Sequence, residues 1–200
     1  MIAIIDYGAG NLTSVARALA YLGYDGRITA APEMILGADQ VIFPGVGAAR
    51  ATMDNLNAGG LSAVLRQVYE SGKPMLGICI GIQILFNHSE EEDTPCLGIL
   101  PGVVKKFEAT PTLKVPQIGW NEVYQTQSHP IFQGVPNPAH FYFVNSYYPI
   151  PREISCVIGK TTYGVEFCSA VAYENLVATQ FHLEKSGRIG LKMLDNFLHA

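Results

Sequence analysis

The sequence predicts an α/β fold in which a mostly parallel sheet is extended by antiparallel strands. In the first half, short apolar runs alternate with segments of helical periodicity, which is typical of parallel strands joined by right-handed helical crossovers. From Gly98 onward prolines and glycines multiply, and short apolar runs follow one another with few helices between them. This change predicts hairpins that extend the same sheet and form a smaller antiparallel sheet, within a single domain over residues 1–200.

The elements of the first half follow from apolar runs and the residues that bound them. Asn11 precedes the first helix and is in a position to cap it. Strands end at Gly-rich turns, where active groups of parallel sheets gather. The predicted strands are 2–5, 24–29, 40–43 and 75–78, and the predicted helices are 13–22, 58–70 and 80–86.

The second half is predicted to be rich in strands and to finish with one helix. The last strand continues directly through His182, and the final helix places Ile189, Met193, Leu194 and Phe197 on one apolar side. The predicted strands are 103–107, 117–123, 141–148, 155–161, 169–172 and 177–182, followed by a helix over 188–199.

Composition excludes several classes of partner. The 200 residues carry a net charge of −4 with no basic run, so we expect no nucleic-acid partner. No apolar stretch approaches the roughly 20 residues that a membrane helix needs, and the first residues lack the pattern of a signal peptide. The four cysteines show neither pairing nor metal-ligand spacing, which predicts free thiols in the cytoplasm, without a metal or cofactor.

A Gly-x-Cys-x-Gly pattern, Gly77 to Gly81 around Cys79, predicts a nucleophile elbow. The strand before Cys79 and the helix after it would present the thiol at a helix N-terminus, which favours the thiolate. A Cβ at either glycine would block a substrate or the neighbouring strand. The alternative is a buried cysteine between two packing glycines.

The turn Pro44-Gly45-Val46-Gly47 is expected at the same sheet edge as the elbow. A thiolate attacking a carbonyl needs hydrogen-bond donors for the developing oxyanion. We predict one donor at the amide of Ile80 and another near Val46 or Gly47. An ordinary strand-to-loop turn is the alternative. The acidic run at 90–93 is either a solvated loop or a site for a substrate ammonium group.

His182 is the predicted base for Cys79, and Glu184 the carboxylate that orients it. The chemical need is clear, because a free thiol with a pKa of about 8.5 is only a few per cent thiolate at neutral pH. The other histidines lie in loops, beside prolines or at the C-terminus. The alternative is a structural histidine at the end of a strand.

These motifs resemble the class I (triad) glutamine amidotransferases over essentially the whole chain. The elbow and the segment from Gln180 to Ser186 carry the resemblance to the superfamily. Four further segments narrow it to glutaminase subunits that serve imidazole glycerol phosphate synthesis: 6–12, 44–47, 119–121 and 141–147. The resemblance implies a three-layer, doubly wound sheet and hydrolysis of L-glutamine through a Cys79 thioester.

The resemblance also implies roles for residues around the triad of Cys79, His182 and Glu184. It implies ammonia transfer to a cyclase subunit with a (β/α)8 barrel, bound as a heterodimer in histidine biosynthesis. Val46 and Gly47 belong to the segment that forms the oxyanion hole, which is thought to rearrange first. The implied glutamine-binding residues are Gly45, Gly47, Gln83, Glu91, Ser146 and Tyr147, and the implied partner-facing residues are Asn11, Trp120, Tyr142 and Lys185.

Three positions depart from the family pattern. Leu183 stands where proline is usual, and Gln117 and Asn145 replace histidines by amides that do not titrate near neutrality. These changes motivate two alternatives: an amidotransferase supplying ammonia to another synthase, and a binding subunit without activity. A thiol hydrolase or a glyoxalase-like protein of similar fold is a further alternative.

Overall fold

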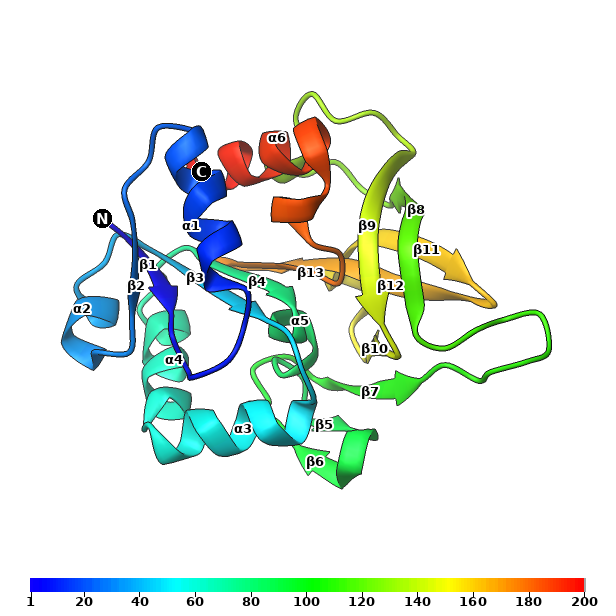
Figure 1. Ribbon diagram of the computed structural model, residues 1–200, viewed down its shortest axis with the longest axis horizontal. Helices are drawn as coiled ribbons and strands as arrows, with labels where there is room; N and C mark the ends of the chain where they lie inside the picture. The colour runs from blue at the N-terminus through cyan, green and yellow to red at the C-terminus, as the bar shows by residue number, and fades with distance from the viewer. Residues whose placement is uncertain (200) are drawn as a thin grey trace.

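The computed structural model describes residues 1–199. A nine-stranded sheet forms its centre (Figure 1). The first five strands in spatial order are parallel, and the other four pair antiparallel. In that order they are β2 (Gly26–Thr29), β1 (Ile2–Ile5), β3 (Gln40–Gly45), β4 (Met75–Cys79), β13 (Leu176–Thr179), β12 (Val165–Tyr173), β11 (Val157–Tyr163), β8 (Gln117–Gln125) and β9 (Ala139–Asn145).

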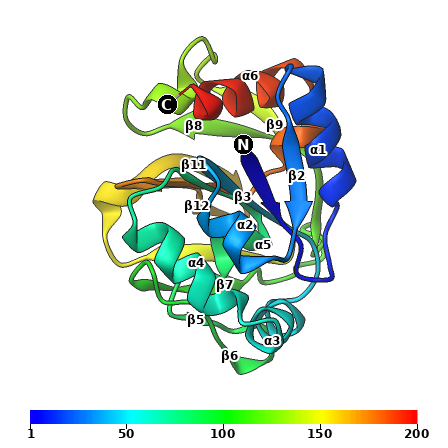
Figure 2. The ribbon, with the colours of Figure 1, turned by 90° about the vertical axis from the view of Figure 1, so that its left-hand side faces the viewer.

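Helices cover both faces of the parallel half, which produces the three expected layers (Figures 1 and 2). Successive residues of a strand point to opposite faces, so Ile2 and Ile4 join one buried cluster while Ala3 and Ile5 join the other. α1 and α6 cover the first face, and α2, α3 and α4 the second. The helices are α1 (Leu12–Tyr21), α2 (Pro32–Leu36), α3 (Ala49–Ala58), α4 (Leu61–Glu70), α5 (Ile80–Gln83) and α6 (Gly187–Leu198).

A four-stranded sheet lies beside the elbow, and it is mixed rather than wholly antiparallel as expected. Its two outer pairs are antiparallel, but the pair β5–β7 in its middle is parallel. In spatial order the strands are β10 (Tyr147–Pro151), β7 (Gly102–Lys106), β5 (His88–Ser89) and β6 (Thr94–Pro95). Single turns of 3₁₀ helix are η1 (Glu91–Asp93), η2 (Pro130–Phe132), η3 (Ile154–Cys156) and η4 (Leu183–Lys185).

Several boundaries differ from the sequence expectation. The helix expected at 58–70 begins at Leu61, and α3 before it was not predicted. Gly59 and Gly60 separate the two helices, and Gly60 has a φ of 69°. The helix expected after Cys79 is a single turn. The last strand ends at Thr179, although His182 still forms an isolated bridge with Tyr142 of β9.

The strand register brings the carboxyl ends of β3, β4 and β13 together. Gly45 is level with Cys79, and Ile78 is level with Thr179. The elbow, the Gly45–Gly47 turn and the segment that carries His182 therefore leave the sheet at one edge. Among residues 1–199, none of the helices has the length and apolar character needed to cross a membrane.

Candidate active site

Cys79 occupies a strained position at the junction of β4 and α5. Its backbone has φ 58° and ψ −106°, an unusual conformation for a residue other than glycine. Such strain costs about 1–3 kcal/mol and persists where the surrounding structure enforces it. Here the end of a buried strand and the start of a helix enforce it, and the side chain is directed into a pocket.

The two glycines of the elbow are required by close packing. A Cβ on Gly81 would lie 2.5 Å from the Phe43 carbonyl oxygen on β3. A Cβ on Gly77 would lie 2.9 Å from the Gly81 oxygen. Both neighbours are backbone atoms that cannot move aside locally. The steric explanation derived from the sequence therefore agrees with the packing of the elbow.

His182 and Glu184 form a buried pair. The distance between His182 Nδ1 and a Glu184 carboxylate oxygen is 2.8 Å, and each side chain is 2% exposed. The backbone N–H of His182 donates to the Tyr142 carbonyl oxygen at 3.0 Å, which fixes this segment against β9. The turn closes with Leu183 between the two residues, so proline is not needed there.

The surroundings of His182 favour its protonated form. Burial alone lowers the pKa of the imidazole, but hydrogen bonding to Cys79 and Glu184 and their negative charges outweigh burial and raise the pKa to about 10. A protonated imidazole beside a cysteine favours its thiolate. The arrangement therefore suits a Cys–His nucleophilic pair that is oriented by a carboxylate.

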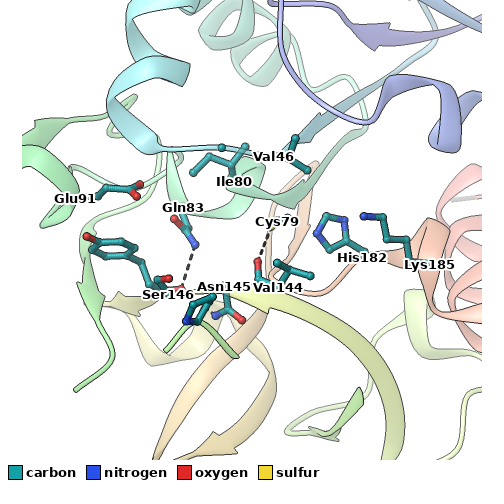
Figure 3. Close-up of a pocket in the computed structure, with 13 residues that line it drawn as sticks. Val46, Cys79, Ile80, Gln83, Glu91, Val144, Asn145, Ser146, His182 and Lys185 are labelled. Atoms are coloured by element: carbon teal, nitrogen blue, oxygen red, sulfur yellow. Dashed lines mark hydrogen bonds between the residues drawn. The ribbon is translucent and has the colours of Figure 1, made fainter. Parts of the chain in front are cut away.

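A pocket of about 260 Å³ joins these groups (Figure 3). Glu91 and Gln83 lie on one side of Cys79, and His182 and Lys185 on the other. The resemblance implies that Gly45 binds glutamine, but Gly45 is not among the residues that line the pocket. It lies buried at the end of β3, where it packs against Ile80. The lining residues are Val46, Gly47, Cys79, Ile80, Gln83, Glu91, Pro116, Val144, Asn145, Ser146, Tyr147, His182 and Lys185.

The three residues predicted for the oxyanion hole meet at this pocket. Ile80 is the first residue of α5, and Val46 and Gly47 follow β3. Tyr7 packs behind the turn with its ring against Phe43. Burial raises the pKa of Tyr7 to about 12, against contacts with Thr52 and the Val46 backbone that lower it. The Val46 backbone therefore lies next to a buried hydroxyl group.

Glu91 connects the acidic loop to the segment after the oxyanion turn. Its carboxylate accepts a 2.6 Å hydrogen bond from the backbone N–H of Ala49, the first residue of α3. Burial raises the pKa of Glu91. Arg50 reinforces the connection by donating to the carbonyl oxygens of Glu92 and Asp93 at 2.7 and 2.9 Å. Glu91 thus forms part of the pocket wall, while Glu90, Glu92 and Asp93 are exposed to solvent.

The predicted partner-facing residues come from three parts of the fold: Trp120 and Tyr142 are cross-strand partners on β8 and β9, Lys185 lines the pocket, and Asn11 precedes α1. Trp120 is 57% exposed, and its ring meets the ring of Tyr142 edge-on at 6.0 Å. Lys185 is exposed, and Asn11 is partly exposed at the start of α1. The Asn11 side chain accepts from the Ser14 hydroxyl group and makes no side-chain hydrogen bond to a backbone N–H of the helix.

Two exposed apolar residues of this face were missed by the sequence reasoning. Ile118 is 65% exposed and pairs across the strands with Val144, which is 36% exposed. They lie on the same side of the β8–β9 hairpin as Trp120 and Tyr142 because side chains alternate along strands. The alternation of side chains along β8 and β9 can be recognised in the sequence. It does not reveal which of the two faces is left uncovered by other elements of the fold.

The two amides that depart from the family pattern lie opposite each other. Gln117 and Asn145 are cross-strand partners on β8 and β9 and are 3% and 5% exposed. Asn145 lines the pocket and donates to the Tyr147 carbonyl oxygen at 3.0 Å. Neither side-chain polar atom of Gln117 has a hydrogen-bond partner among residues 1–199. Both amides belong to the interior of the chain rather than to its exposed face.

Comparison with known proteins agrees with this geometry. The family model described as glutamine amidotransferase class-I matches residues 3–200. The chain belongs to the class I glutamine amidotransferases. It is 50% identical over 198 residues to the imidazole glycerol phosphate synthase subunit HisH of Dehalococcoides mccartyi, covering 98% of this chain and 96% of that protein. The HisH protein of Maridesulfovibrio salexigens is 49% identical, with 98% and 95% covered.

Solved structures of other proteins share the fold. A glutamine amidotransferase structure superposes with a TM-score of 0.75 at 18% identity, covering all of this chain and 98% of that one. The structure of PurLQS from Thermotoga maritima superposes with a TM-score of 0.73 at 16% identity, covering 99% and 97%. At these identities the likeness concerns the fold. It accords with the expected three-layer α/β architecture.

Proposed function

We propose that this glutamine amidotransferase is the glutaminase subunit of an imidazole glycerol phosphate synthase. The observation that carries the proposal is that Cys79 and His182 line one pocket and Glu184 contacts His182 at 2.8 Å, in a chain about half identical to HisH proteins along its length. The products in this role would be glutamate and ammonia. The cytoplasm stays the expected location, on the ground of the four free thiols.

The first half of the reaction follows from the positions of Cys79 and His182. The Cys79 thiolate attacks the side-chain amide carbon of glutamine, forming a C–S bond and a tetrahedral oxyanion. The Ile80 amide and an amide at Val46 or Gly47 serve as its donors. His182 gives its proton to the amide nitrogen, and the C–N bond breaks. Ammonia is released, and a glutamyl thioester remains on Cys79.

The second half uses the same groups in the opposite protonation order. His182 now takes a proton from water, and the hydroxide attacks the thioester carbon. The C–S bond then breaks, glutamate leaves, and His182 with the Cys79 thiolate is restored. Glu184 keeps the imidazole oriented throughout. Gln83, Glu91, Ser146 and Tyr147 are the proposed contacts for the amino-acid part of glutamine, with Gly47 contributing backbone.

The proposed partner is a cyclase subunit with a (β/α)8 barrel. The apolar face around Trp120, Ile118 and Val144 supports a docking surface at the rim of the pocket, because aromatic residues dominate the energy of many interfaces. Tyr142 lies on the same face and Lys185 lines the pocket beside Val144, and Asn11 is the further contact that we propose. Ammonia released at Cys79 would then leave toward the partner.

Supply of ammonia to a different synthase is the weaker alternative. It was motivated by Gln117 and Asn145, and both are buried within the chain. They are therefore poorly situated to select a different partner by direct contact. The alternative of an inactive binding subunit loses support because the three triad residues lie together.

A reconstitution assay tests the proposal. Glutamine hydrolysis is measured for the chain alone, with the cyclase, and with the cyclase and its nucleotide ligand, together with growth of a strain lacking its own glutaminase subunit. We expect stepwise activation and growth without added histidine. Cys79→Ala should abolish hydrolysis, while Cys96→Ala, which changes a thiol outside the triad, should retain it. Hydrolysis that persists in Cys79→Ala would exclude Cys79 as the nucleophile.

A further inference from the structure

Gln180 is a buried polar residue that the triad mechanism leaves without a role. It follows β13 directly, two residues before His182, and its side chain is fully buried. Its Nε2 lies 3.8 Å from the Cys79 sulfur, within reach of a hydrogen bond to sulfur. Its Oε1 accepts a 3.0 Å hydrogen bond from Gln83 Nε2. One amide side chain thus contacts both the nucleophile and a residue of the proposed glutamine site.

A backbone carbonyl fixes the direction of this hydrogen-bond chain. Gln83 Nε2 also donates to the Tyr147 carbonyl oxygen at 3.1 Å, and a carbonyl oxygen can only accept. If the Gln83 amide were turned over, its oxygen would lie against that carbonyl oxygen. Gln83 must therefore direct its nitrogen toward Tyr147 and Gln180. Gln180 in turn must present its oxygen to Gln83 and its nitrogen to Cys79.

The direction of the chain has two chemical consequences. An N–H group beside sulfur stabilises the thiolate more than the thiol, because hydrogen bonds to charged acceptors are about twice as strong as neutral ones. Both N–H groups of Gln83 are engaged by protein acceptors. Its oxygen therefore faces the pocket, on the side away from Tyr147 (Figure 3).

We propose that Gln180 stabilises the Cys79 thiolate with its N–H group and holds Gln83 so that the Gln83 oxygen accepts from an N–H group of the substrate. The second part rests on the proposed glutaminase function, since it takes glutamine as the substrate. The first part concerns Cys79 alone. It requires no substrate, so the two parts can be tested separately.

Two substitutions separate the donor from the acceptor. Gln180→Leu removes both, whereas Gln180→Glu keeps an oxygen toward Gln83 and puts a second oxygen beside the sulfur. The readout is the pH midpoint of Cys79 alkylation by iodoacetamide, followed by mass spectrometry of the Cys79 peptide. We expect the midpoint to rise by roughly one pH unit in Gln180→Leu and by more in Gln180→Glu. Thr161→Val, which removes a buried hydroxyl group bonded to Ser169, should leave it unchanged.

The second part is read from the kinetics of glutamine hydrolysis. Gln180→Leu removes the hydrogen-bond acceptor that holds Gln83, whereas Gln180→Glu retains it. The KM for glutamine of the Gln180→Leu variant should therefore be at least threefold higher than that of the Gln180→Glu variant. Alkylation midpoints equal to wild type in both Gln180 variants, with unchanged near-ultraviolet circular dichroism, would overturn the thiolate part. Equal KM values in the two variants would overturn the Gln83 part. Shifted midpoints in a protein that never hydrolyses glutamine would support the thiolate part and refute the proposed function.

A measurement on the unchanged side chain covers the case in which the variants do not fold. In ¹⁵N-labelled wild-type protein, the Gln180 side-chain amide resonance should shift with pH at the midpoint of Cys79 alkylation. The shift should disappear in Cys79→Ser at that midpoint. A Gln180 resonance that does not respond to pH in the wild type would contradict the inference without any substitution at Gln180.

Discussion

At the scale of single residues, the site depends on two side chains that would be unfavourable to bury apart. His182 and Glu184 are each 2% exposed and share a 2.8 Å contact. Removing one partner of a buried ion pair leaves an uncompensated charge, which is more costly than loss of an exposed pair. The pair therefore orients the base and also contributes to stability in a pH-dependent way.

We predict that the stabilisation by this pair declines as pH rises. The pKa of His182 is raised to about 10 in the folded chain, so the contribution is fully present below the ordinary imidazole pKa of about 6.5 and is lost as pH passes through about 10. Glu184→Gln should reduce the free energy of unfolding by about 3 kcal/mol at pH 6 and by less at pH 10. Denaturant unfolding at both pH values checks this, and an equal loss at both would contradict it.

At the scale of elements, the elbow exposes the thiol through packing rather than through a long helix. α5 has only four residues, so the macrodipole invoked from the sequence is that of a single turn. What holds Cys79 in its strained conformation is the contact between β3, β4 and α5. The Phe43 carbonyl oxygen lies where a side chain at Gly81 would begin.

The matched pair Gly81→Ala and Gly59→Ala tests this packing. At Gly81 the new methyl group would meet a backbone oxygen at 2.5 Å, and we expect a loss of roughly 2–3 kcal/mol together with most glutaminase activity. At Gly59, where φ is −84° and the nearest contact is 3.4 Å, stability should change by less than about 1 kcal/mol. Similar effects of the two substitutions on unfolding and hydrolysis would refute the explanation.

At the scale of the whole molecule, the sheet brings the catalytic groups to an edge that is bordered by an exposed apolar face. Trp120 and Ile118 are more than half exposed on β8, although most large apolar side chains of residues 1–199 are buried. The same hairpin carries Tyr142, whose backbone holds His182 in place. A partner that binds this face would therefore contact the strand next to the base.

We predict that Trp120→Ala weakens binding of the proposed cyclase by at least about tenfold, because a central aromatic anchor can contribute 2 kcal/mol or more. Tyr21→Ala is the control, since Tyr21 is 79% exposed on α1, on a helix that covers the opposite half of the sheet. Titration calorimetry of each variant with the cyclase measures the difference. Equal affinities for the two variants would exclude Trp120 from the interface core.

Local sequence patterns were enough to predict the strands and turns that carry the catalytic residues. The apolar runs before Cys79 and around Val41 indicated strands because both faces of a parallel sheet are buried. The glycines around Cys79 indicated a tight turn, and the spacing of His182 and Glu184 indicated an oriented base. α3 escaped prediction because Met53 and Leu56 are the two large apolar residues on its buried face, and Asp54, Asn55 and Asn57 are weak helix formers.

By itself, the sequence determined which residues can carry the chemistry and the local conformations they adopt, because glycine spacing, apolar periodicity and an acid two residues from a histidine act over a few residues. Only the tertiary structure decided that Gln180 lies against the Cys79 sulfur, that Gln117 opposes Asn145, and that Ile118 stays uncovered. Those contacts join residues distant in the chain. They depend on strand register and on which sheet faces lack a covering helix, which no short segment encodes alone.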